Sequence, residues 1–305
     1  MNKKRIYLII LALLLTLSWV GNLTYFYSQR LAEPVFLKNY IESTLFPNQN
    51  LEIELYYIVN RDETPDLVSV ELPNLEKVYV RLRTFTFNTY SHYVLKRAII
   101  SIDRPQVDDF LGLDKISISQ LRVHFSNGMT KVVDVGEINY KPLRSPNQLV
   151  FKNTASGSSN NHSGFREFLV DQPIVIKSVD YSHKELLGDA LRVYLSISQT
   201  PSEHARDRND LNPDTREKSK DIFDENQLVN RTKFPIQVQS GSYLRISYQF
   251  NQFNDRRSYD YYKIKAHIIT QTSEGQEADQ EFEIWYQPFF EEKDIKQVIR
   301  ERREE

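Results

Sequence analysis

Hydrophobic residues follow two different patterns along this chain of 305 residues. Between Ile6 and Tyr27, roughly 22 residues run without a charge, and a helix of that length crosses a hydrocarbon core of about 30 Å. From Leu51 onward, apolar residues instead alternate with polar ones. The first pattern predicts a transmembrane helix over residues 6–27, and the second predicts β-strands.

The charges beside the apolar segment predict its orientation. Lys3, Lys4 and Arg5 precede it, whereas only Arg30 follows closely. Because basic residues are retained on the cytoplasmic side, residues 1–5 are expected in the cytoplasm and the remainder outside the cell. A cleaved signal peptide begins in the same way, but no A-x-A cleavage site follows here. We therefore favour a retained anchor over a cleaved peptide and over a buried helix.

Two blocks of alternating segments predict an all-β body. The first block covers residues 51–151 and the second covers residues 165–290, with Pro, Asn, Asp and Gly between the segments. Short strands at this spacing are typical of sandwiches and barrels, so we expect two β-sandwich-like domains. The dipeptide Asn127-Gly128 predicts a β-hairpin with a type I′ turn, which needs positive φ angles at both residues.

Two less regular segments are expected to connect these parts. Residues 28–50 contain Pro34 and Pro47 and predict a juxtamembrane stalk or one short helix. Residues 152–164 are small and polar throughout, so they predict a flexible linker between the two β domains.

Charged residues dominate two later segments. Residues 200–231 are too long and too polar for a plain turn and predict a charged loop, either disordered or holding one short helix. Residues 291–305 place Ile295, Val298 and Ile299 at helical spacing, which predicts a short, charged C-terminal helix on the surface.

The composition of the chain bears on its partners and on its location in the cell. The chain has 39 basic and 41 acidic residues, and setting aside the cytoplasmic cations leaves an acidic body. Such a body binds polyanions poorly, so nucleic acid is not expected as a partner. The chain has no Cys, which excludes disulfides and thiolate metal sites. An exported body without disulfides favours a bacterial protein, and we expect it at the cell membrane of a Gram-positive organism.

Sequence motifs give no catalytic residue and no cofactor. The chain lacks a phosphate-binding glycine loop, H-E-x-x-H, G-x-S-x-G and S-x-x-K, and its six His residues are scattered singly. One segment resembles a calcium loop through Asp210, Asn212, Asp214 and Asp221. However, Thr215 stands where such a loop needs Gly, so we favour a solvated charged loop over a metal site.

Aromatic residues gather in both β blocks. Phe85, Phe87, Tyr90 and Tyr93 lie in the first, and a larger group in the second includes Tyr259, Tyr261 and Tyr262. Flat aromatic faces can stack on sugar rings or anchor a protein, so Tyr259, Tyr261 and Tyr262 are the candidate binding surface. Most aromatic residues in strands pack in cores instead, and we favour that interpretation of both groups.

These observations favour a binding or scaffold role over catalysis. We expect a single-pass membrane protein whose extracytoplasmic body contacts another envelope protein or cell-wall polysaccharide. Its general plan resembles that of membrane-anchored proteins of Gram-positive bacteria, which assigns no functional residue. The alternative is a membrane-anchored cell-wall hydrolase or other envelope enzyme, whose site would be assembled from distant carboxylates.

Overall fold

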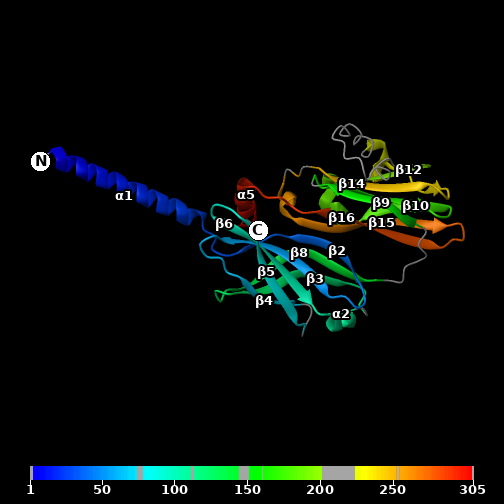
Figure 1. Cartoon of the computed structure of the whole chain (residues 1–305), viewed down its shortest axis with the longest axis horizontal. Helices are drawn as coiled ribbons and strands as arrows, with labels where there is room; N and C mark the ends of the chain where they lie inside the picture. Colours follow the sequence, from blue (N-terminus) through cyan, green and yellow to red (C-terminus); the bar gives the residue numbers. More distant parts are fainter. Residues whose placement is uncertain are drawn as a thin grey trace.

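The computed structural model describes residues 3–73, 78–110, 113–143, 151–159, 161–200, 224–251, 253 and 255–303. Strands dominate it, with one long helix at the N-terminus and a short helix at the C-terminus (Figure 1). The expected all-β class with these two helices is confirmed.

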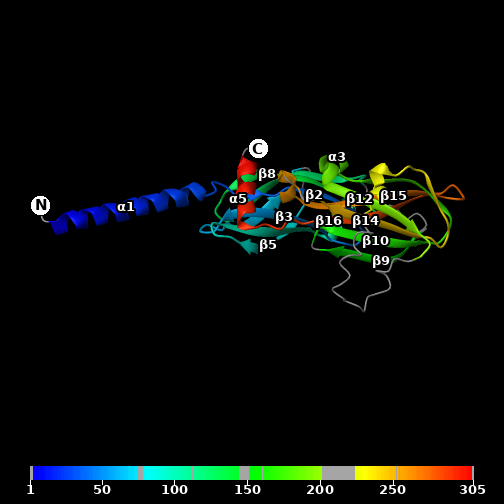
Figure 2. The ribbon, with the colours of Figure 1, turned by 90° about the horizontal axis from the view of Figure 1, so that it is seen from above.

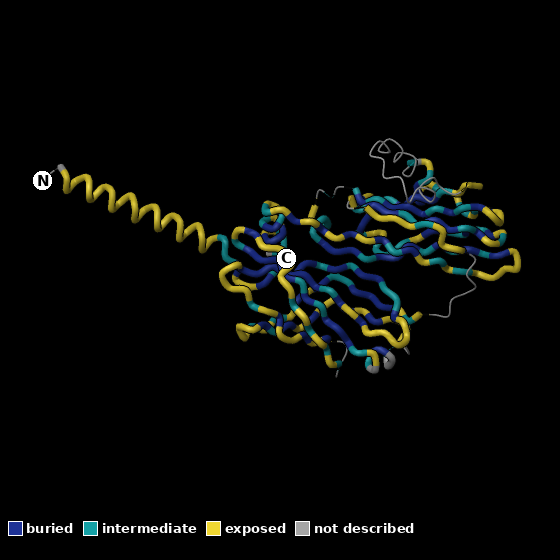
Figure 3. Tube along the Cα trace, in the orientation of Figure 1, coloured by how far each residue is buried: buried dark blue, intermediate teal, exposed yellow. Residues whose placement is uncertain are grey.

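The long helix α1 (Lys3–Gln29) projects away from the body (Figures 1 and 3). By length and composition, the helix from Lys4 to Gln29 is apolar enough to cross a membrane, and its apolar stretch is not buried against the described body. Leu, Ile and Ala predominate in its first two-thirds, and the Leu and Ala residues are strong helix formers. An exposed apolar surface of this size is unfavourable in water, which is consistent with a lipid environment.

Two sheets enclose a first hydrophobic core next to α1. One sheet has the order β1 (Val35–Phe36), β3 (Leu51–Asn60), β6 (Tyr93–Ile102), β5 (Val80–Thr89). The facing strands are β2 (Asn39–Leu45), β8 (Thr130–Pro142), β7 (Ile116–Phe125) and β4 (Leu67–Glu71), and α2 (Arg104–Phe110) links β6 to β7. Alternate residues of both sheets, such as Ile53, Ile100 and Leu121, are buried between them. We call this cluster the proximal core.

A second pair of sheets encloses a separate core farther from α1 (Figure 1). One sheet has the order β12 (Leu191–Ser198), β14 (Tyr243–Phe250), β10 (Ser163–Val170), β9 (Phe151–Ser159). The facing strands are β13 (Ile236–Val238), β11 (Ile174–Tyr181), β15 (Tyr261–Thr272) and β16 (Glu277–Tyr286). Short helical turns lie at the ends of these strands: α3 (Lys184–Leu187), η1 (Gly188–Ala190), η3 (Glu225–Gln227), η4 (Val229–Arg231) and η5 (Arg256–Tyr259). We call this cluster the distal core.

Strand β2 joins the two halves into one eight-stranded sheet. It runs parallel to β8 on one side, with Asn39 opposite Gly136, and parallel to β15 on the other, with Asn39 opposite Tyr261. A short segment near the N-terminus therefore connects strands from the two halves of the sequence. Residues 28–50 do not form the expected stalk, because Leu37, Asn39 and Ile41 of this segment are buried.

The C-terminal helix α5 (Glu292–Arg303) returns to the proximal core (Figures 1 and 2). Ile295, Val298 and Ile299 are all buried there. Arg302 forms an ion pair with Asp260, and both side chains are almost completely buried. The helix was expected, but its apolar residues pack inside the first half of the fold.

Two connecting segments also differ from expectation. Residues 152–159, expected to be part of a flexible linker, belong to strand β9, which pairs antiparallel with β10. Their small polar side chains show no hydrophobic period because most of this edge strand is exposed on both faces. In the charged loop, residues 201–223 lie outside the described residues, whereas Leu228 and Val229 are buried.

The hairpin expected at Asn127-Gly128 joins β7 to β8, with His124 opposite Thr130. Its turn is not of type I′, because Gly128 has a φ of 84° while Asn127 is not among the residues with positive φ. The Asn127 side chain instead accepts a hydrogen bond from the backbone N–H of Met129 at 3.1 Å. Asn therefore stabilises this turn through its amide oxygen.

Candidate functional site

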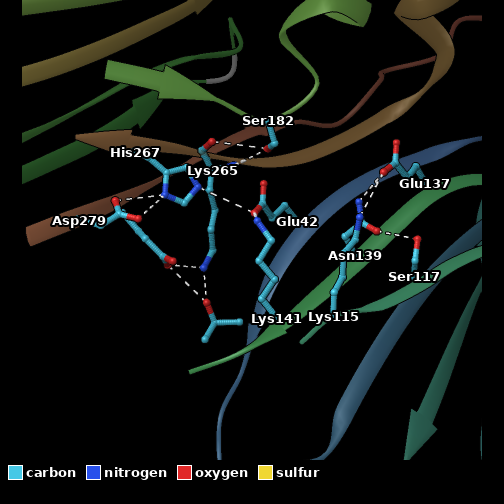
Figure 4. A network of polar contacts seen from close by, with 12 residues as sticks. Glu42, Lys115, Ser117, Glu137, Asn139, Lys141, Ser182, Lys265, His267 and Asp279 are labelled. Carbon is cyan, nitrogen blue, oxygen red and sulfur yellow. Dashed lines mark hydrogen bonds and ion pairs between the residues drawn. The ribbon is translucent and has the colours of Figure 1, made fainter. Parts of the chain in front are cut away.

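A network of charged side chains lies where β2 and β8 meet β15 and β16 (Figure 4). Lys265 donates hydrogen bonds to Thr44 and Glu281, and Lys141 pairs with Glu42. Nδ1 of His267 lies 2.9 Å from Asp279, and its Nε2 lies 3.9 Å from Glu42. Because these groups come from both halves of the chain, the network stabilises one arrangement of the two cores.

Opposite charges alternate on this face because of the strand register. On strand β15, Lys265 lies opposite Glu283 of β16, and His267 lies opposite Glu281. Each side chain instead contacts the diagonal acid two residues along β16, so that Lys265 pairs with Glu281 and His267 with Asp279. Diagonal neighbours in an antiparallel pair are within reach of long side chains. The sequence shows the individual charges but not this register.

The partners of His267 and Glu42 determine the direction in which their pKa values shift. The hydrogen bond with Asp279 raises the pKa of His267, although partial burial acts in the opposite direction. Burial raises the pKa of Glu42, but hydrogen bonds from Lys141 and Ser182 outweigh it and leave that pKa below its ordinary value. Glu42 is therefore held as an ionised carboxylate. A cell-wall hydrolase would need a general acid whose pKa is raised, and the lowered pKa of Glu42 does not suit that role.

His183 lies beside the network and is nearly buried. Its φ of 58° is in the left-handed region, and its Nδ1 is 3.5 Å from Glu137. Burial lowers its pKa, so the imidazole is neutral at neutral pH. In the described residues, no group of three or more His, Asp and Glu side chains is placed to hold a metal ion.

The candidate binding residues Tyr259, Tyr261 and Tyr262 do not form an exposed surface together. Tyr261 is 6% exposed and Tyr262 is fully buried, so neither forms part of a surface. Tyr259 is half-buried and stacks on Phe290 at 6.2 Å between ring centroids. The four residues of the calcium-like pattern, Asp210, Asn212, Asp214 and Asp221, lie outside the described residues.

A different group of aromatic residues is exposed where the two halves meet. Phe85, Phe87 and Trp285 are 48%, 47% and 47% exposed. Phe87 packs edge-on against Tyr56 at 5.3 Å, and Tyr56 lies 6.1 Å from Tyr261. The β15–β16 register places Trp285 on the same face as Tyr261. We call the exposed rings of Phe85, Phe87 and Trp285, with the buried Tyr56 and Tyr261 packed beneath them, the junction aromatic face.

Charged groups are interspersed with these rings. Arg97 donates from Nε to Glu54 at 3.0 Å, and the register places Arg97 opposite both Phe85 and Tyr56. Nζ of Lys263 lies 4.7 Å from the Trp285 ring, whose Nε1 donates to Glu283 at 3.2 Å. Exposed rings beside fixed donors and acceptors suit the recognition of a sugar or of a protein surface.

The sequence pattern indicates only some of the residues in this face. The first aromatic group contains Phe85 and Phe87, whereas Trp285 belongs to neither group, although Tyr286 follows it directly. Alternation was the available signal: Phe282, Ile284 and Tyr286 point into the distal core, so Trp285 must point outward.

Comparisons with known proteins give only weak similarity. No protein-family model matches the chain, and no curated protein matches its sequence. The sialic acid binding region of a Streptococcus sanguinis SK1 adhesin, bound to 3'sLn, has 10% identity and a TM-score of 0.24, with 84% of this chain and 78% of that chain covered.

Two further solved structures are similar at the same level. The Enterococcus faecalis MSCRAMM ACE, which binds its ligands by the collagen hug, has 9% identity and a TM-score of 0.22, covering 86% of this chain and 96% of that chain. The YadV chaperone has 9% identity and a TM-score of 0.19, with 82% of this chain and 99% of that chain covered. TM-scores this low assign neither a fold family nor a ligand to this chain.

Proposed function

We propose that this chain is a single-pass membrane protein whose extracytoplasmic body binds another envelope component, either a protein or cell-wall polysaccharide. Helix α1 is the anchor, residues 1–5 lie in the cytoplasm, and the two cores act as two β domains. The single observation that carries the binding role is the junction aromatic face, an exposed set of rings on a body attached to an apolar helix.

Exposure of aromatic side chains to water is unfavourable. The packing of the two cores does not require three exposed aromatic side chains on one face, so this exposure needs another explanation. The rings are also fixed, because Tyr56 and Tyr261 beneath them are buried and Glu283 holds the Trp285 indole. A rigid aromatic anchor loses little conformational entropy on binding, so such residues contribute much of the affinity at interfaces.

The experiment is co-sedimentation and crosslinking of the full-length protein with purified cell walls and with solubilised envelope proteins. Substituting Phe87→Ala together with Trp285→Ala should reduce capture at least about tenfold, since each anchor contributes about 1 kcal/mol or more. Tyr79→Ala removes an exposed ring outside this face and should leave capture unchanged.

The partner class follows from which fraction retains the protein. Retention by protein-free walls identifies polysaccharide, and crosslinks to one envelope protein identify a protein partner. Equal capture by the double variant and the unmodified protein would exclude the junction aromatic face as the binding surface.

A further inference from the structure

The outer end of α1 forms a cavity with the body at the depth of lipid headgroups. The uncharged segment begins at Ile6, and about 20 helical residues cross the hydrocarbon. Residues 26–30 therefore lie at the outer headgroup level, where aromatic residues such as Phe26 and Tyr27 are typical. This placement rests on the proposed anchoring of α1.

The body is held tightly against this end of the helix. The Asn60 side chain accepts from the backbone N–H of Leu31 and donates to its carbonyl, both at 2.8 Å. The Tyr93 hydroxyl donates to the carbonyl of Gln29 at 2.6 Å, and the Tyr25 ring lies edge-on to His92 at 5.9 Å. The β3–β4 and β5–β6 loops are therefore fixed at headgroup height beside the helix.

These two loops and the helix end enclose a cavity of about 290 Å³. Its lining includes Phe26, Arg30, Arg61, Asp62, Ser91 and His92. Phe26 supplies an apolar wall at the end that is nearest the bilayer, and the loops supply polar groups on the other side. A headgroup whose acyl chains continue along α1 has the same distribution of apolar and polar parts.

Two arginines, Arg30 and Arg61, line the cavity against one carboxylate, Asp62, and this excess of positive charge favours an anion. Arg30 forms ion pairs with Asp62 at 3.2 Å and with Glu63 at 2.7 Å, which engages both of these carboxylates. The Arg61 guanidinium is exposed, and its side chain makes no hydrogen bond or ion pair among the described residues. Guanidinium is well suited to binding phosphate through paired N–H donors. The Ser91 hydroxyl and the His92 ring lie in the same lining and can add donors.

We infer that this cavity binds the phosphodiester headgroup of an anionic phospholipid from the outer face of the membrane. Arg61 donates to the phosphate oxygens, Ser91 and His92 complete the polar contacts, and Phe26 contacts the first acyl carbons. The bound lipid would add contacts at the junction that Asn60 and Tyr93 already hold, and so strengthen the attachment of the body at headgroup height.

The test uses the full-length protein in neutral detergent, with thermal unfolding followed as lipid is added. Phosphatidylglycerol should raise the thermal midpoint, because a ligand of the folded state stabilises it by mass action. Phosphatidylcholine and inorganic phosphate should have little effect at the same concentration. Arg61→Gln should weaken the apparent phosphatidylglycerol affinity about tenfold, the loss expected for one charge-assisted contact.

Lys233→Gln is the matched control, since it removes one exposed positive charge from the distal half and should leave lipid affinity unchanged. An equal response to phosphatidylcholine, a full response to inorganic phosphate, or unchanged affinity in Arg61→Gln would each overturn the lipid site. Alkaline carbonate extraction of reconstituted vesicles tests the anchor separately. Protein released by carbonate contradicts the proposed anchoring, whereas protein retained without phosphatidylglycerol preference contradicts only the headgroup site.

Discussion

Gly136 occupies the point where β2 joins β8, and its environment leaves no space for a side chain. Its φ is 89°, and a Cβ atom there would lie 2.5 Å from the backbone oxygen of Asn39. Asn39 is itself fully buried and pairs with both neighbouring strands of the shared sheet. Neither backbone can move aside without disturbing the connection between the two cores.

We therefore predict that Gly136→Ala destabilises the protein more than Gly128→Ala. Gly128 also has a positive φ, but a Cβ added there would meet nothing within 4 Å. Gly128→Ala should cost about 1 to 2 kcal/mol for the backbone conformation alone. Gly136→Ala should cost at least about 2 kcal/mol more because of the added clash. Denaturant unfolding of both variants measures the difference, and equal losses would show that β2 and β8 can separate locally.

Individual aromatic residues show what the sequence can and cannot predict at this scale. Alternation correctly indicates strands around Tyr261 and Tyr262, but adjacent residues of one strand point to opposite faces. Here both faces are covered: Tyr262 points into the distal core and Tyr261 packs in the proximal core. No local pattern reveals that a second body covers the outer face.

Helix α5 packs against strands that lie far from it in the sequence. It follows the last strand of the distal half, yet Ile295, Val298 and Ile299 are buried with strands of the proximal half. The Tyr90 hydroxyl also donates to the carbonyl of Phe290 at 3.2 Å just before the helix. The proximal core is therefore completed only when the last residues of the chain are in place.

Substitutions in α5 should report on the proximal core. Ile295→Ala should lower the free energy of unfolding by about 2 to 5 kcal/mol, the usual cost of deleting a buried aliphatic side chain. Arg300→Ala, on the exposed face of the same helix, should change it by less than about 0.5 kcal/mol. Thermal or denaturant unfolding measures both. A small effect of Ile295→Ala would mean that the helix docks only weakly on the folded core.

The elements that the sequence predicted well are those with a strong local period. Helix α1, the strands with alternating apolar residues and the helical spacing in α5 all fall in this class. Strands β2 and β9 were missed because their formation depends on partners. β2 lies between two parallel neighbours, and β9 gains backbone hydrogen bonds along the edge of β10. Pairing with strands that are distant in the sequence therefore outweighs the weak β-propensity of these two segments.

In the whole molecule, the shared sheet and the C-terminal helix couple the two halves while α1 extends from the proximal half. The attachment through Asn60 and Tyr93 leaves little freedom between the helix and the body. If α1 crosses the bilayer, the proximal core lies next to the membrane and the distal core lies farther from it, as the arrangement in Figure 1 indicates. The orientation is then determined by the basic residues before the apolar segment.

Single-cysteine labelling tests this orientation, because the natural chain has no Cys. Ser158→Cys places a thiol on the exposed edge strand β9, and it should react with a membrane-impermeant maleimide in intact cells. Asn2→Cys should react only after the membrane is permeabilised. Permeabilised cells provide the control that both thiols are reactive. Labelling of residue 2 but not of residue 158 in intact cells would reverse the topology. Labelled protein recovered mainly from the medium would instead show that the apolar helix is removed by cleavage, since only a retained helix keeps the body at the membrane.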